Sequence, residues 1–216
     1  PELEFLNLPA KDVEFHSRNS KLNLKGWYVA APDKKHTIIF VHGLGANRSS
    51  GNALLIGSVL WKNGFNVLFF DLRASGNSEG DMVSGGYFEQ EDLLGAFDFV
   101  RNTGIPAGNI GVLGFSMGAA TSILSASKET GIQAVVSEGT YAALMDLIAQ
   151  EVERATPLPG WMVPLFQPGI MISANILYGM KLDTVIPEKA ASEINYPIFL
   201  IHGTDMNARV PLEHSI

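Results

Sequence analysis

A motif of the type G-x-S-x-G, at residues 114–118, is the feature of this sequence that best suits covalent chemistry. An apolar run precedes it, and a run that favours a helix follows it. In that context the motif is typical of a sharp turn that lifts the serine hydroxyl above the edge of a sheet. The two glycines permit the strained turn and a close approach of helix to strand. We therefore predict that Ser116 is a nucleophile, with the N-terminus of the following helix beside the negative charge that develops on attack.

A second loop, residues 42–47 (His-Gly-Leu-Gly-Ala-Asn), follows directly after another apolar run. Acyl transfer through a serine needs two N–H donors for the oxyanion of the tetrahedral intermediate. We predict that these donors are the backbone N–H groups of Leu44, in this loop, and of Met117, the residue after the nucleophile. His42 is predicted to be a hydrogen-bonding scaffold residue rather than a general base, and the polar turn at 71–78 is predicted to brace the site.

The elements that must position these loops follow a simple alternation. Two early stretches alternate in polarity, as expected for half-exposed antiparallel strands at 13–17 and 22–31. The predicted parallel strands lie at 37–42, 66–71, 109–115, 133–137 and 197–202, and the predicted helices at 51–63, 89–102, 117–128 and 141–155. Strands that alternate with helices favour a parallel sheet, which binds ligands beyond the carboxyl ends of its strands.

Residues 156–193 interrupt this alternation with apolar helical segments that are punctuated by proline. One interpretation is an extra helical layer with its own small core. The other, compatible with the first, is a cap over the active site whose apolar face lines an acyl pocket. We predict that Trp161 and Phe166 belong to this substrate pocket.

Composition excludes several classes of function. The 216 residues include 15 basic and 22 acidic ones, for a formal net charge of −7. Nucleic-acid binding is not expected, because it requires a basic face. The absence of cysteine excludes disulfides, thiolate metal sites and a cysteine nucleophile. No cluster of side chains has metal-ligand spacing, so we expect neither a metal nor an organic cofactor.

The sequence also bears on membranes and location. The apolar stretch at 158–177 is interrupted by three prolines and two glycines, which argues against a membrane-spanning helix. No signal peptide is visible at the N-terminus. We expect a cytoplasmic protein, with a removed N-terminal signal or anchor as the alternative. The oligomeric state is left open.

Four motifs appear in an order that resembles the α/β-hydrolase superfamily over nearly the whole chain. They are the His-Gly loop at 42–47, the Asp-x-Arg-x-Ser-Gly-x-Ser turn at 71–78, the serine motif at 114–118 and Ile-His-Gly-Thr-Asp at 201–205. The most similar branch is that of bacterial serine esterases and acylglycerol-lipase-like proteins with a helical cap. The resemblance implies an α/β fold in one domain, residues 1–216, with a mostly parallel, doubly wound sheet and a small cap insertion at about 156–193. It also implies the order nucleophile, acid, base along the chain.

The acid and the base are less well marked. The family pattern His-Gly-x-x-Asp-x-x-Val-Pro places the acid on Met206 when counted from the histidine and on Asn207 when counted from the proline. We predict that Asp205 is the acid, with Glu138 as the alternative because some members carry it after the preceding strand.

The base is expected well beyond the acid, and none of the five histidines suits it: they are His16, His36, His42, His202 and His214. We therefore expect the catalytic histidine, one more strand and one more helix to lie beyond residue 216.

Together these features predict a serine hydrolase that cleaves small-molecule carboxylic esters through an acyl-enzyme on Ser116. An apolar cap favours esters with an apolar acyl or alcohol part. One alternative is a non-catalytic member of the same fold that binds an apolar ligand. Another is a peptidase or thioesterase of this fold, because the fold alone does not select the substrate.

Overall fold

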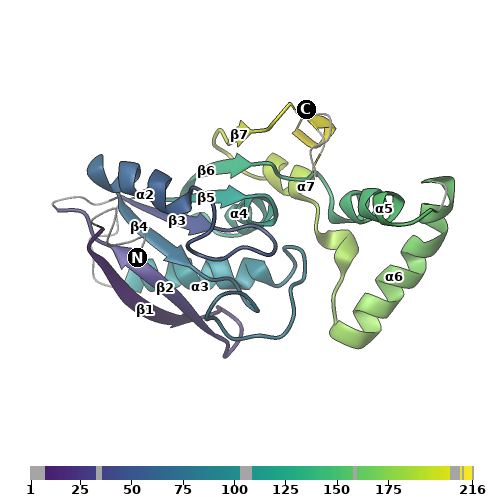
Figure 1. Cartoon of the computed structure of the whole chain (residues 1–216), viewed down its shortest axis with the longest axis horizontal. Helices are drawn as coiled ribbons and strands as arrows, with labels where there is room; N and C mark the ends of the chain where they lie inside the picture. The colour runs from purple at the N-terminus through teal and green to yellow at the C-terminus, as the bar shows by residue number, and fades with distance from the viewer. Residues whose placement is uncertain are drawn as a thin grey trace.

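The computed structural model describes residues 8–32, 36–102, 109–157, 160–204, 210 and 212–215. Within these residues one sheet of seven strands has the order β1-β2-β4-β3-β5-β6-β7 (Figure 1). The strands are β1 (Ala10–His16), β2 (Asn23–Val29), β3 (Thr37–Val41), β4 (Asn66–Phe70), β5 (Ile110–Phe115), β6 (Ile132–Glu138) and β7 (Phe199–Ile201). All seven overlap strands that the sequence predicted.

The sheet is antiparallel at one edge and parallel elsewhere. β1 pairs with β2, and β2 with β4, in antiparallel fashion. From β4 through β3, β5 and β6 to β7, every pairing is parallel. All five residues of β4 are buried, as expected for a parallel strand covered on both faces. The predicted α/β fold with a mostly parallel sheet is therefore confirmed.

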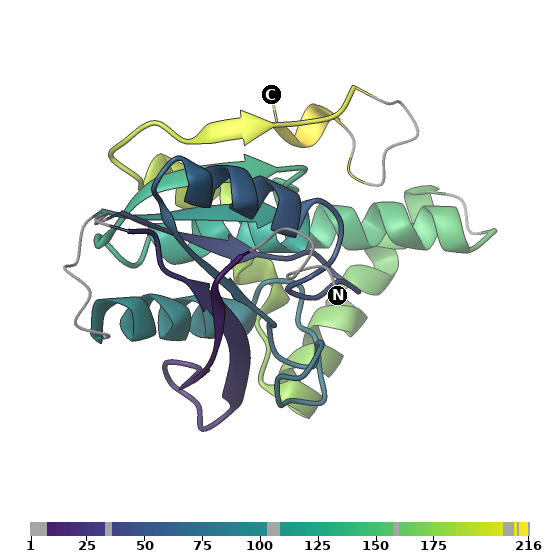
Figure 2. The same ribbon diagram turned by 60° about the vertical axis from the view of Figure 1, so that its left-hand side comes forward.

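Helices cover both faces of the sheet (Figure 2). They are α2 (Ala53–Lys62), α3 (Glu89–Asn102), α4 (Met117–Ala126), α5 (Leu144–Ala155), α6 (Val163–Tyr178) and α7 (Pro187–Ser192), with short 3-10 turns η1 (Gly160–Met162), η2 (Leu182–Thr184) and η3 (Leu212–Ser215). On one face Leu54 of α2 packs with Phe40 and Phe69. On the other, α3 and α4 bury Phe97 and Ile123 in the larger core. Two apolar layers thus hold the sheet rigid beneath the loops at its carboxyl edge.

The helices α5 and α6 pack against each other as a hairpin that projects from the sheet (Figure 1). The sequence placed the cap insertion at about 156–193, and α6 lies in that range. However, α5 precedes it, and α7, which the range includes, packs against α4 in the layer below the sheet. The projecting part therefore consists of α5 and α6 with the turns η1 and η2.

Candidate active site

Ser116 occupies the single position between β5 and α4, and its backbone is strained. Its φ of 52° and ψ of −118° lie outside the regions that residues with a side chain ordinarily adopt. The backbone N–H of Ser116 donates to the carbonyl oxygen of Glu138 at 2.7 Å, which ties the turn to the end of β6. The residue is exposed. Such strain persists where the surrounding structure enforces it, and it gathers at active sites.

The two glycines of the motif are required by space. A Cβ on Gly114 would lie 2.5 Å from the hydroxyl of Ser122, and it would overlap the carbonyl of Gly118 as well. A Cβ on Gly118 would lie 2.5 Å from the carbonyl oxygen of His42. Strand β5 and helix α4 therefore lie too close together for any side chain at residue 114. Likewise, α4 lies too close to the end of strand β3 for any side chain at residue 118. This close packing sets the position of Ser116.

The loop after β3 passes directly over the serine turn. A Cβ on Gly43 would lie 3.1 Å from the carbonyl oxygen of Phe115, so the backbones are nearly in contact. Leu44 follows, and Met117 begins α4, where the first N–H groups of a helix have no partner within it. Ser116, Leu44 and Met117, which the sequence predicted as nucleophile and oxyanion donors, all line the same cavity.

His42 fixes this loop from below. Its Nδ1 donates to the carbonyl oxygen of Gly43 at 2.8 Å, and its Nε2 accepts from the N–H of Leu72 at 3.0 Å. These two bonds require the neutral tautomer that carries its proton on Nδ1. Burial lowers the pKa of His42, although the Gly43 carbonyl and nearby carboxylates oppose the shift. With both nitrogens engaged, His42 acts as the predicted scaffold residue.

Buried charges brace the neighbouring loops. The Asp71 carboxylate accepts from the backbone and the guanidinium of Arg48, each at 2.8 Å, and so links the turn at 71–78 to the loop after β3. Arg73 forms a two-pronged ion pair with the fully buried Asp92 of α3, at 2.9 and 2.6 Å. The predicted bracing role of the 71–78 turn agrees with these contacts.

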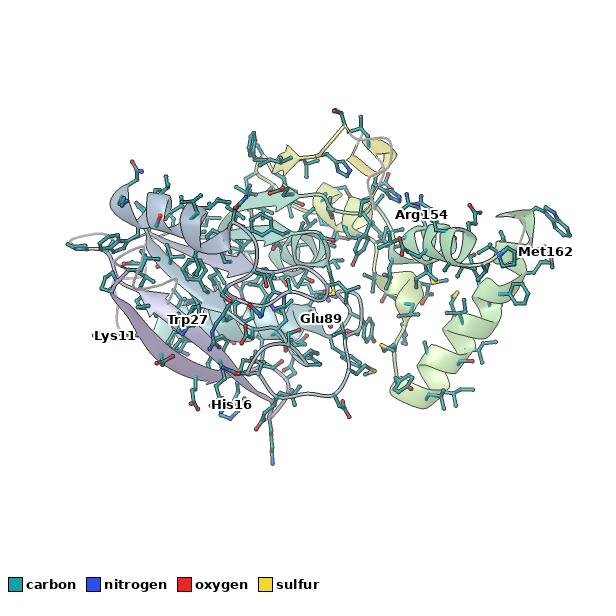
Figure 3. The ribbon with its side chains drawn as sticks, in the orientation of Figure 1. Lys11, His16, Trp27, Glu89, Arg154 and Met162 are labelled. Carbon is teal, nitrogen blue, oxygen red and sulfur yellow. The ribbon has the colours of Figure 1, made fainter. Side chains whose placement is uncertain are left out.

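Sequence reasoning did not find Glu89, the first residue of α3. This carboxylate is fully buried, within the body of the molecule (Figure 3). It accepts hydrogen bonds from the backbone and hydroxyl of Ser84 and from the backbone of Gly86, at 2.6 to 2.8 Å. Tyr141 donates to the carbonyl of Gly85 at 2.6 Å. Glu89 and Tyr141 thus hold the Gly85 loop against the cavity. The sequence signal that could have identified Glu89 is an acidic residue at the start of a helix, shortly after a serine and two glycines.

The cavity beside Ser116 has a volume of about 400 Å³. One face of α5 forms much of its wall, together with loop residues from the sheet edge. The wall residues from α5 are Leu144, Leu147, Ile148, Glu151, Val152 and Ala155. Trp161 and Phe166, predicted for this pocket, are not in its wall and expose 73% and 49% of their surface. The apolar wall of this cavity therefore comes from α5, which precedes the predicted insertion at about 156–193, and not from Trp161 or Phe166.

Of the two predicted acids, only Glu138 lies in the part of the chain that the structure describes. Asp205 lies outside the described residues. Glu138 ends β6, and its side chain is exposed. β7 ends level with it, because Glu138 pairs with Ile201. The residues that follow β7 therefore leave the sheet at the edge where Ser116 stands, and Val210 returns to the cavity wall.

The histidines near this edge have other contacts. Nε2 of His202 lies 2.8 Å from the carbonyl oxygen of Val210. Nδ1 of His214 accepts from the backbone of Ala142 at 3.1 Å. Among the residues that the structure describes, no group of three or more metal-ligating side chains could share an ion, and no helix is long and apolar enough to cross a bilayer.

Comparison with known proteins now adds to this geometry. A family model described as "alpha/beta hydrolase fold" matches residues 36–185, which span β3 to the end of η2. The chain belongs to the α/β-hydrolase fold family. This confirms the resemblance that the four motifs indicated.

Similar α/β-hydrolase proteins include an esterase of known structure. Pf2001, an esterase of Pyrococcus furiosus, superposes with a TM-score of 0.78 at 27% identity, over 98% of this chain and 77% of that chain. YqkD, an uncharacterized protein of Bacillus subtilis strain 168, is 30% identical over 185 residues. Human ABHD12B is 24% identical over 201 residues. The matches cover 85% and 87% of this chain but only 59% and 50% of these two relatives, so the chain spans little more than half of their length.

Proposed function

We propose that this protein is a serine carboxylic-ester hydrolase that works through an acyl-enzyme on Ser116. The observation that carries the proposal is the strained backbone of the exposed Ser116, which lines an apolar cavity. Holding a residue in such a conformation costs about 1–3 kcal/mol, which a fold retains where the strain has a use. The similarity to an esterase over 98% of the chain supports the same conclusion.

The first step would be attack of the Ser116 hydroxyl on the ester carbonyl carbon. The carbonyl oxygen becomes an oxyanion, and the N–H groups of Leu44 and Met117 would bind it more strongly than they bind the neutral ester. The N-terminal end of α4 adds a positive partial charge at the same point. The alcohol leaves with a proton, and water then releases the acid and regenerates the serine.

A base must remove the proton of Ser116, because a neutral hydroxyl is a weak nucleophile. We assign this role to a histidine outside residues 1–216, since His42 is committed to the loop and the relatives extend well beyond the match. Asp205 would orient that histidine, with Glu138 as the alternative. Glu138 ends β6, and Asp205 follows β7 in the sequence; both strands end at the Ser116 edge of the sheet.

The substrate class follows from the cavity. Its wall is largely aliphatic, and its volume of about 400 Å³ suits the acyl or alcohol part of a medium-chain ester. A peptide or a charged thioester would leave more polar groups unpaired against this wall. We therefore favour small, apolar carboxylic esters over the peptidase and thioesterase alternatives.

The alternative from a different class is a non-catalytic protein of this fold that binds an apolar ligand in the same cavity. A binding protein would explain the cavity. It would not explain why Ser116 is strained, or why residues 114 and 118 are packed so closely that only glycine fits. An activated serine distinguishes the two functions directly, because an alkyl fluorophosphonate labels only a serine whose proton is removed.

The test is the intact mass of the full-length natural protein before and after incubation with an alkyl fluorophosphonate. We expect a single adduct that disappears in Ser116→Ala and persists in the matched control Ser192→Ala, which alters an exposed serine of α7. Hydrolysis of p-nitrophenyl esters should follow the same pattern. A full-length protein that forms no adduct would contradict the hydrolase and favour the binding protein, and an adduct that survives Ser116→Ala would contradict the assignment of Ser116 as the nucleophile.

A further inference from the structure

The surface of α6 is unusual for a helix of a water-soluble domain. No Asp, Glu, Lys or Arg occurs from residue 155 to residue 180, although the chain as a whole has a net charge of −7. Seven large apolar side chains of this segment are nevertheless exposed: Trp161, Leu165, Phe166, Ile172, Ile176, Leu177 and Tyr178. Met162, at the start of α6, lies at the tip of the projecting hairpin (Figure 3). So many exposed apolar side chains on one short segment indicate an interaction surface.

The exposed residues include a regular stripe. Leu165, Gly169, Ile172 and Ile176 are separated by four, three and four residues, which is the spacing of a helix that packs along another helix. Leu165, Ile172 and Ile176 expose 67%, 59% and 77% of their surface. At 100° per residue this stripe lies opposite the side of α6 that carries the buried residue Ala174.

Gly169 forms a notch in the middle of the stripe. A Cβ at this position would meet no atom of the described residues outside its own helix turn within 4 Å, so none of the described contacts requires a glycine here. Glycine in a helix interior costs about 1 kcal/mol relative to alanine. A glycine between large side chains does allow a second helix to approach closely, as it does where helices pack through small residues.

The stripe is complementary to itself. If two copies of α6 lie antiparallel about a twofold axis between residues 170 and 171, Leu165 of one meets Ile176 of the other. In the same arrangement Ile172 of each copy fills the notch at Gly169 of its partner. An isologous interface requires this reciprocity, because the same patch must fit itself. We propose that α6 is the dimer interface of this protein, paired antiparallel with the α6 of a second copy.

Charge favours a second copy as the partner. The stripe alone would bury less than the roughly 800 Å² per partner of a standard interface, because Phe166, Leu177 and Tyr178 lie on other sides of the helix. Two chains of charge −7 repel each other, and contact through the uncharged stretch keeps their acidic residues apart. A bilayer fits less well, since helices that lie in a membrane surface carry Lys or Arg on their polar face and α6 has none.

The experiment is sedimentation of the full-length protein, which needs no catalytic activity. We expect the wild type to be a dimer, and Ile172→Glu to raise its dissociation constant by at least about 100-fold, because each dimer would bury two unpaired carboxylates. The matched control is Val59→Glu on α2, whose target is also an exposed apolar residue of a helix (52% exposed) and which should leave the dimer intact. Gly169→Glu is a second variant that removes no contact within the monomer. It should dissociate the dimer, while at a concentration where the wild type is also monomeric its free energy of unfolding should be kept or raised.

The register is tested by cross-linking, which is simple because the chain has no cysteine. An oxidised mixture of Gly169→Cys and Ile172→Cys chains should give mainly covalent heterodimers. A monomeric wild type, a dimer that resists both glutamate substitutions, or a dimer that Val59→Glu also dissociates would each overturn the proposal. So would a monomer that binds neutral phosphatidylcholine vesicles through Ile172, since α6 would then be a lipid-binding helix.

Discussion

Replacing Gly118 by alanine adds one methyl group at the closest contact in the active site. The new Cβ would lie 2.5 Å from the carbonyl oxygen of His42 and closer still to that of Val41. Both are backbone atoms at the end of β3, so no side-chain rotation can make room. Overpacking of this kind costs about 1–3 kcal/mol, and a contact with rigid backbone belongs at the upper end. Alanine returns about 1 kcal/mol as the better helix former.

We therefore expect Gly118→Ala to lower the free energy of unfolding by about 2 kcal/mol. The control is the same substitution at Gly169, also within a helix, where a Cβ meets nothing within 4 Å. In the monomer only the helix propensity changes there, so at a protein concentration low enough to keep the chain monomeric the free energy of unfolding should rise by about 1 kcal/mol. Urea titration of both variants at one protein concentration measures a difference of about 3 kcal/mol between them.

The same methyl group should impair chemistry. To accommodate it, α4 must shift relative to β3, which moves Ser116 and Met117 away from Leu44. A displacement of about 1 Å can reduce a rate about 100-fold, so fluorophosphonate labelling of folded Gly118→Ala should slow by about that factor. If Gly118→Ala were as stable and as reactive as Gly169→Ala, the packing of α4 on β3 would not be what positions the serine.

Three further predictions concern the cavity, the buried charges and the scaffold histidine. Ile148→Trp fills part of the cavity and should shorten the preferred acyl chain of p-nitrophenyl esters by about two carbons, whereas Glu153→Trp, on the exposed side of α5, should leave it unchanged. Arg73→Met leaves the carboxylate of Asp92 buried without its partner and should cost about 3–5 kcal/mol in urea unfolding; a loss below 1 kcal/mol would contradict this account. Because burial lowers the pKa of His42 below 6.5, the unfolded chain binds a proton first as the pH falls below about 6.5. The stability that neutral His42 contributes is complete above that pH and is lost below it. The wild type should therefore exceed His42→Gln in free energy of unfolding by less at pH 5.5 than at pH 7.5. A difference that stays constant between these pH values would refute the reasoning.

The sequence by itself determined the sheet and the nucleophile turn. Short apolar runs such as 67–70, which alternate with helical segments, favour strands that are buried on both faces of a parallel sheet, so their order along the chain nearly dictates the fold. The motif at 114–118 is recognisable locally, since its glycines and serine lie within five residues, although the contact of Gly118 with β3 that requires glycine arises only in the folded sheet. The strands and the motif could be predicted because their patterns are read from neighbours in the chain.

Tertiary structure alone decided which helix lines the cavity and which charges pair. α6 is apolar on most sides, so its sequence cannot say which side packs inward, and Trp161 and Phe166 were placed in the pocket although they face solvent. Arg73 lies 19 residues from Asp92, and sequence offers several other acids at similar distance. Pairing of this kind, like the choice of α5 as the cavity wall, depends on how rigid layers dock across the whole fold, because burial and direction in space arise only once the sheet and both helical layers have assembled.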